Sequence, residues 1–150
     1  METVLEYELL PKCISSKGII SESYTMAWNK NDIFEAIEEI CKLNYAILGG
    51  DVWAINVKDI IYNYTPIDYS NIYVGIIPDK NGREYACNWY SDKKQNENWL
   101  NYVKRSRKET INYINKLKIE EIVNQDIKIY YNLTFSDEQK HNKLLEIKSR

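Results

Sequence analysis

The stretch Tyr45-Ala-Ile-Leu-Gly-Gly-Asp-Val-Trp53 decides how the rest of this sequence is interpreted. It follows a helical pattern and joins two apolar runs through a double glycine and one carboxylate. Two adjacent glycines indicate a backbone that needs positive φ, or a close approach that leaves no room for a Cβ. We therefore predict strands at 45–48 and 52–57, joined by a tight turn at Gly49 and Gly50 that carries Asp51.

Two amphipathic helices are predicted, one before and one after the main run of strands. The first begins at the N-cap Asn31, and its apolar face contains Ile33, Ile37, Ile40, Cys41 and Asn44. The second is the longest, at about residues 98–117, and its apolar stripe contains Trp99, Val103, Ser106, Thr110, Tyr113 and Leu117.

The segment 59–90 has a β pattern, with expected strands at 60–64, 73–77 and 83–90. Asn81–Gly82 is a strong hairpin signal between the last two of these runs. A final strand at 126–135 places Ile127, Ile129, Tyr131 and Leu133 on one face. Residues 136–150 form either a short terminal helix or a frayed tail. The predicted fold is therefore α+β, a single domain over residues 1–150 with a mostly antiparallel sheet packed by two main helices.

Composition places the chain among ordinary globular proteins, with 44% apolar and 28% charged residues. No apolar run approaches the length of about 20 residues that a membrane span needs, and the N-terminus is acidic where a signal peptide would be basic. We expect a cytoplasmic protein. Cys13, Cys41 and Cys87 are odd in number and far apart, which argues against a disulfide framework and a zinc knuckle.

The sequence contains no recognisable catalytic or metal-binding motif, and we expect no cofactor. Its single histidine, His141, lies in the polar C-terminal segment, where we interpret it as a solvated surface residue. Asp51 could act with Glu84 or Asp92 as an acid–base pair, but we favour a turn aspartate that binds nearby backbone N–H groups.

The one basic cluster, Lys104-Arg-Ser-Arg-Lys108, lies on the longest predicted helix. Four cations over five helical positions spread around most of the circumference, so a solvated helix face is favoured over a patch for nucleic acid. The net charge of −2 is also too small to indicate a polyanionic partner.

Two ordered motifs resemble one family. The stretch Leu43-Asn-Tyr-Ala-Ile-Leu-Gly-Gly-Asp-Val-Trp53, after a helix, is similar to an element typical of the bacterial immunity protein 40 family. The second match is Asn88-Trp-Tyr-Ser-Asp92, followed by a polar linker and Trp99-Leu-Asn-Tyr-Val-Lys-Arg-Ser106. The resemblance covers about Leu10 to about Leu117, and the segment 57–78 departs from it.

The resemblance implies a binding protein without catalysis, which neutralises a cognate toxin domain of a polymorphic toxin system. High affinity in such a protein usually depends on a preformed surface with aromatic anchors and a charged rim. We place that surface on exposed members of Gly49–Trp53 and Asn88–Tyr90 together with the long helix, namely Asp51, Trp53, Asn88, Tyr90 and Tyr102. Core packing is the favoured role for Trp53, Trp89 and Trp99, whereas Tyr90 and Tyr102 lie off the apolar faces.

Three alternatives remain open at this point. A small enzyme with a carboxylate site around Asp51 would need a concave pocket with convergent acids. A ligand-binding module, for instance for glycans, would use exposed stacked members of the thirteen tyrosines and four tryptophans. A nucleic-acid binder would use Lys104–Lys108 and lose affinity steeply with salt.

Overall fold

The computed structural model describes residues 5–148. Along the chain its helices and strands are α1 (Glu6–Leu9), α2 (Lys12–Ser15), β1 (Ile19–Ser21), β2 (Met26–Trp28), α3 (Lys30–Lys42), β3 (Ala46–Asn56), β4 (Pro66–Ile67), β5 (Ile72–Val74), β6 (Ile76–Pro78), β7 (Glu84–Ala86), β8 (Asn88–Tyr90), α4 (Trp99–Lys116), β9 (Ile127–Ser136) and α5 (Glu138–Lys148). Short 3₁₀ turns lie at Val57–Asp59, Tyr69–Asn71 and Ile119–Glu121.

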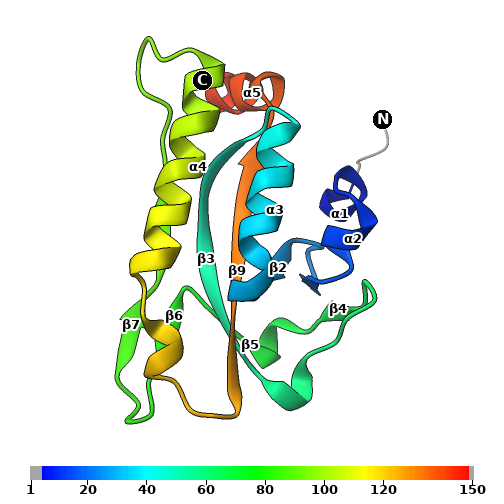
Figure 1. Cartoon of the computed structure of the whole chain (residues 1–150), viewed down its shortest axis with the longest axis vertical. Coiled ribbons are helices and arrows are strands. Elements are labelled where there is room, and N and C mark those ends of the chain that lie inside the picture. Colours follow the sequence, from blue (N-terminus) through cyan, green and yellow to red (C-terminus); the bar gives the residue numbers. More distant parts are fainter. Residues whose placement is uncertain (1–4, 149–150) are drawn as a thin grey trace.

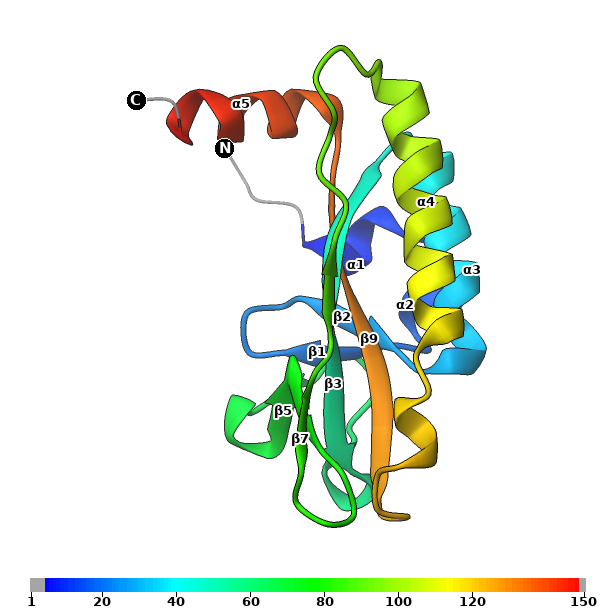
Figure 2. The same ribbon diagram turned by 90° about the vertical axis from the view of Figure 1, so that its left-hand side faces the viewer.

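A twisted seven-stranded sheet forms the centre of the molecule, with the strand order β4-β1-β2-β9-β3-β5 and with β8 on the same edge of β3 as β5. All its pairs are antiparallel except β1–β4. Helices α3 and α4 lie side by side over one face (Figure 1). Figure 2 shows α5 projecting from the other side of the sheet, which we call the open face. The predicted α+β fold with two main helices is confirmed.

Helix α3 begins two residues earlier than the sequence indicates. The side chain of Asn29, not Asn31, caps it by accepting a hydrogen bond from the Asp32 N–H at 3.1 Å. Asn and Asp are both good capping residues, so several polar residues in a row leave the exact start ambiguous. The predicted apolar face is correct, because Ile33, Ile37 and Ile40 are fully buried against the sheet.

Helix α4 packs on the sheet through both apolar and hydroxyl side chains. Its cap is Asn98, whose side chain accepts from the Asn101 N–H at 2.8 Å. Ser106 Oγ accepts a hydrogen bond from the Ile47 N–H at 3.0 Å. Thr110 Oγ1 accepts one from the Trp89 indole at 3.1 Å. The two polar members of the predicted stripe therefore satisfy groups of the sheet that the helix buries.

The predicted turn at Gly49–Gly50 is wrong, because both glycines lie inside the continuous strand β3. A β-bulge between Ile47 and Gly49 shifts the register against β9. A Cβ on Gly50 would lie 2.1 Å from the Asn132 carbonyl oxygen and 2.4 Å from the Trp89 ring. A Cβ on Gly49 would lie 2.2 Å from the Trp89 carbonyl oxygen. Close approach of neighbouring backbones, and not chain reversal, is thus the reason for the two glycines.

The segment 59–90 contains shorter strands than the sequence predicts. The Asn81–Gly82 hairpin is confirmed, with Ile77 opposite Tyr85. Residues 60–64 form no strand, and the run at 73–77 divides at Gly75, which has a φ of +75°. Three backbone hydrogen bonds form a closed triangle at this break. The Gly75 N–H donates to the Val52 carbonyl at 2.8 Å, and the Val52 N–H donates to the Cys87 carbonyl at 2.9 Å. The Cys87 N–H donates to the Gly75 carbonyl at 2.7 Å.

Strand β9 lies between β2 and β3, and its middle residues, Ile129–Leu133, are buried on both faces. As predicted, Ile129, Tyr131 and Leu133 share a face, which packs under α3 and α4. On the other face Tyr130 joins a second cluster with Trp53 and Ile55, covered by residues of the 60–72 segment. The terminal segment forms the predicted short helix, α5, which contains no buried residue; residues 149–150 lie outside the described part of the chain.

Replacing Gly50 tests this account of the glycine pair. Gly50→Ala inserts a methyl group against backbone and a buried ring, and we expect it to lower the free energy of unfolding by about 3 kcal/mol. The control is Gly82→Asn, because a Cβ at Gly82 meets nothing within 4 Å and asparagine tolerates its φ of +81°. Urea unfolding measures both variants, and equal small losses would contradict the close-approach explanation.

Candidate functional site

Sheet register gathers three of the predicted binding residues on the open face. Asp51 of β3 lies opposite Asn88 of β8, and Gly49 lies opposite Tyr90. Directly opposed residues of antiparallel strands direct their side chains to the same face. Trp89 lies between them in β8 and points the other way, into the core beneath α4. Asp51, Asn88 and Tyr90 therefore form one group, built from two adjacent strands.

A cavity of about 710 Å³ lies above this group, between the open face and α5. Its floor is the β3 backbone at Leu48–Asp51 with Thr134 of β9, and the loop 92–95 forms a wall. Helix α5 contributes His141, Leu144, Leu145 and Lys148. Figure 2 shows α5 crossing over the open face at the end of β9.

Tyr90 is the most exposed large apolar side chain of this cavity, at 77%. Leu144 and Leu145 of α5 are also exposed, at 42% and 52%. Tyrosine offers a large contact area with only two side-chain torsions to immobilise, so an exposed tyrosine beside aliphatic groups suits a binding surface. Asp51 is half-buried on the cavity floor, and this burial raises the pKa of its carboxyl group above the usual value.

Trp53 and Tyr102 are almost completely buried, although Tyr102 is one of the residues that line the cavity. Trp53 is 2% exposed within the second core cluster, which confirms the expected core role. Tyr102 is 1% exposed, in contrast to our expectation, and its hydroxyl donates a hydrogen bond to the Ser91 carbonyl. Its ring packs edge-on against Trp99, with ring centroids 5.4 Å apart. The loop after β8 folds back over α4 and covers this side chain.

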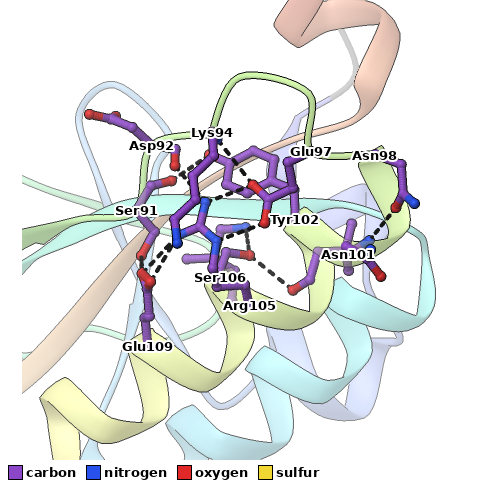
Figure 3. Close-up of polar contacts among 12 residues, drawn as sticks. Ser91, Asp92, Lys94, Glu97, Asn98, Asn101, Tyr102, Arg105, Ser106 and Glu109 are labelled. Atoms are coloured by element: carbon purple, nitrogen blue, oxygen red, sulfur yellow. Dashed lines mark hydrogen bonds and ion pairs between the residues drawn. The ribbon is translucent and has the colours of Figure 1, made fainter.

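Arg105 holds that loop in place (Figure 3). Its guanidinium group donates to both carboxylate oxygens of Glu97, each at 2.8 Å, to Glu109 at 2.8 Å and to the Asp92 carbonyl at 2.6 Å. Ser91 Oγ completes the network by donating to Glu109 at 2.9 Å. Bidentate, charge-assisted pairs of this kind fix geometry as well as adding stability. The Arg105 side chain is the main reason that the pKa of Glu97 falls to about 2.

The basic cluster at Lys104–Lys108 is largely neutralised within the protein. Arg105 is committed to the loop, and Arg107 Nε donates to Glu38 of α3 at 2.8 Å. Only Lys104 and Lys108 of the cluster are fully exposed. Two separated lysines are a weak electrostatic footprint for a nucleic-acid backbone, which supports the earlier choice of a solvated helix face.

His141 is placed differently from the prediction of a solvated surface residue. Its ring lies against Trp99 and Tyr102, at centroid distances of 5.4 and 5.8 Å. Its Nδ1 atom is buried and has no hydrogen-bond partner among the described residues. Burial and the nearby Lys93 lower the pKa of the imidazole. His141 thereby attaches the first turns of α5 to α4 and defines the roof of the cavity.

The cavity brings some acids together and leaves others apart. Asp51 and Asp92 both line it, whereas Glu84 does not.

Among residues 5–148, no three His, Cys, Asp or Glu side chains are grouped as a metal site would require. Within the same range no helix is long and apolar enough to cross a membrane. All four tryptophans are buried, so the exposed aromatic side chains of the described residues are tyrosines.

Sequence reasoning missed the contribution of α5 and of Lys93 to this cavity. The adjacent leucines at 144 and 145, isolated in a polar segment, were the available signal for an apolar contact. Nothing in the sequence indicated that the segment would turn back across the open face.

Residues 14–135 match the model of a family described as Immunity protein 40. No curated protein and no solved structure matches the chain.

The Arg105 network predicts a specific dependence of stability on pH. The folded-state pKa of Glu97, about 2, lies below its ordinary value of 4.5. The contribution of this ion pair is therefore complete above about pH 4.5 and is lost as the pH falls towards about 2. Glu97→Gln should melt below the wild type at neutral pH, and the difference should shrink on acidification. Thermal unfolding at several pH values measures this, with the exposed Glu84→Gln as control, and a constant difference would contradict it.

Proposed function

The chain belongs to the immunity protein 40 family, and from this membership we propose that it binds and neutralises a cognate toxin domain of a bacterial polymorphic toxin system. It does so by protein–protein contact, without catalysis, in the cytoplasm of the cell that produces the toxin. The family match over most of the chain carries the proposal. The exposed group of Asp51, Asn88 and Tyr90 beneath α5 is the surface that we assign to the toxin.

The chemistry of this surface supports a protein partner. Tyr90 supplies an aromatic anchor, and the rim carries Lys93, Lys94 and Lys148 as well as Asp92. An apolar centre with a charged rim is the usual anatomy of a protein interface. Charged rims mainly raise the association rate and exclude wrong partners, which suits an inhibitor that must find one toxin in a crowded cell.

The surface is also preformed. Its floor lies in the middle of a sheet whose strands are paired on both sides of β3, and its wall is fixed by Arg105. Binding to a preorganised surface avoids the free-energy cost of ordering loops and side chains on association.

A carboxylate-dependent enzyme is the second candidate, because Asp51 and Asp92 share a concave cavity and the pKa of Asp51 is raised. No hydrogen bond joins the two carboxyl groups among the described contacts. Mass spectrometry of the toxin after incubation separates the candidates. An intact toxin in a one-to-one complex supports inhibition by binding, whereas a cleaved or modified toxin supports catalysis.

The direct test uses the cognate toxin domain carrying an inactivating substitution. Calorimetric titration should give a stoichiometric complex with a dissociation constant in the nanomolar range or below, as expected for an interface of inhibitor type. Co-expression with the active toxin should restore growth. Absence of both binding and protection would refute the proposed function.

Tyr90→Ala tests the assigned surface. We expect it to weaken toxin binding by about tenfold or more, as expected for a central aromatic anchor. Because the side chain is 77% exposed, thermal stability should hardly change. The control is Tyr73→Ala, which removes a tyrosine that is 53% exposed. Tyr73 is paired with Ala54 of β3, so its side chain lies on the sheet face opposite to Tyr90. Equal binding by both variants would mean that the interface lies elsewhere.

A further inference from the structure

Residues 84–90 form one continuous segment with outward-facing backbone groups, made by β8 at the edge of the seven-stranded sheet and by β7 of the separate two-stranded sheet β6–β7. Strand β8 pairs only with β3, and β7 only with β6, among the residues that the structure describes. The two strands follow one another with a single residue, Cys87, between them. Figure 2 shows β7 and the chain that follows it running along the near side of the sheet.

The hydrogen-bond pattern identifies which groups point outward. Val52 N–H donates to the Cys87 carbonyl, and Ser91 N–H to the Leu48 carbonyl, both at 2.9 Å. Backbone groups in an antiparallel pair point alternately towards and away from the partner. The N–H and C=O groups of Asn88 and Tyr90 therefore point away from β3. The same alternation holds on β7, where the Cys87 N–H donates to the Gly75 carbonyl at 2.7 Å. The N–H and C=O groups of Glu84 and Ala86 therefore point away from β6.

The two edges of the sheet differ in how they are protected. At the far edge, β4 has only two residues, Pro66 and Ile67. Short strands and proline are common means by which proteins prevent unwanted pairing. The 84–90 edge contains neither proline nor lysine, and no bulge interrupts its register. An unprotected edge of this length is suited to pairing with another strand.

This edge continues directly into the surface assigned to the toxin. Asn88 and Tyr90 place their side chains on the open face while their backbone groups point outward. A strand added here would extend the cavity floor, with alternate side chains beside Tyr90 and below the loop that carries Lys93. An apolar side chain next to Tyr90 and an acidic one facing Lys93 would be complementary to this surface.

We propose that the toxin docks by adding an extended β-strand, apolar with an acidic residue, to the 84–90 edge. The inference rests on the proposed function and specifies how the partner is recognised. Main-chain hydrogen bonds to Glu84, Ala86, Asn88 and Tyr90 supply affinity, and the side chains over the open face supply specificity.

Proline substitution tests the backbone contribution separately from the side chain. Asn88→Pro removes an outward N–H and leaves the bonds to β3 intact, as edge strands tolerate. Asn88→Ala removes only the side chain. The probe is the inactivated toxin domain, measured by calorimetry. We expect Asn88→Pro to bind about tenfold or more weakly than Asn88→Ala, through loss of a hydrogen bond and of close strand approach.

A second pair of variants, at Ala86, keeps the test valid if Asn88→Pro fails to fold. Ala86→Pro removes another outward N–H, and Ala86→Ser keeps it; both should melt within about 5 °C of the wild type. Weak binding by the folded proline variants supports strand addition. Binding equal to that of the serine and alanine controls overturns it while leaving toxin inhibition intact.

Two other outcomes also reject strand addition. Toxin-free dimers of the wild type that the proline variants abolish would assign the edge to a second copy of this chain. If the wild type fails to bind the toxin at all, the proposed function falls, and strand addition with it.

Discussion

The close packing of the Asn132 carbonyl oxygen and the Trp89 ring against Gly50 is the constraint on which the rest of the structure depends. The Trp89 ring lies over this glycine, stacks on Tyr113 with centroids 4.8 Å apart and donates its indole N–H to Thr110. One aromatic side chain thus joins the edge strand β8, the central strand β3 and helix α4. This arrangement requires a residue without a Cβ at its centre, and a covering ring compensates for the packing that glycine lacks.

The same contact determines where the surface that we propose for toxin binding can form. Because Trp89 points into the core, its neighbours Asn88 and Tyr90 must point to the open face. The loop after β8 then has to cross the start of α4, where Arg105 binds it and Tyr102 is covered. Helix α5, which follows β9 in the chain, closes the cavity and contacts α4 through His141. Each wall of the cavity is therefore attached to α4, although the cavity lies on the opposite side of the sheet.

Local patterns predicted most of the fold and less of the site. The helical spacing of the α4 stripe, the alternation in β9 and the Asn81–Gly82 hairpin each depend on neighbours in sequence, and each was found where expected. The glycine pair was misread because a turn and a close approach both require a missing Cβ, and only the distant Trp89 and Asn132 distinguish them. The burial of Tyr102 was missed for a similar reason. Its position, three residues after Trp99 and four before Ser106, lies at the edge of the apolar stripe, and an ion-paired loop covers it.

Alternation along β3 separates residues that pack in the core from residues of the proposed binding surface. Gly50, Val52 and Ala54 face the helices, where a change of one methyl group disturbs the core. Asp51, between them, faces the cavity, and no described residue forms a hydrogen bond with its carboxylate. Its burial raises the pKa, so the ionised form lowers stability at neutral pH instead of adding to it. Under the proposed function, substitutions on the cavity face alter which toxin is bound, while the helix-covered face preserves the fold.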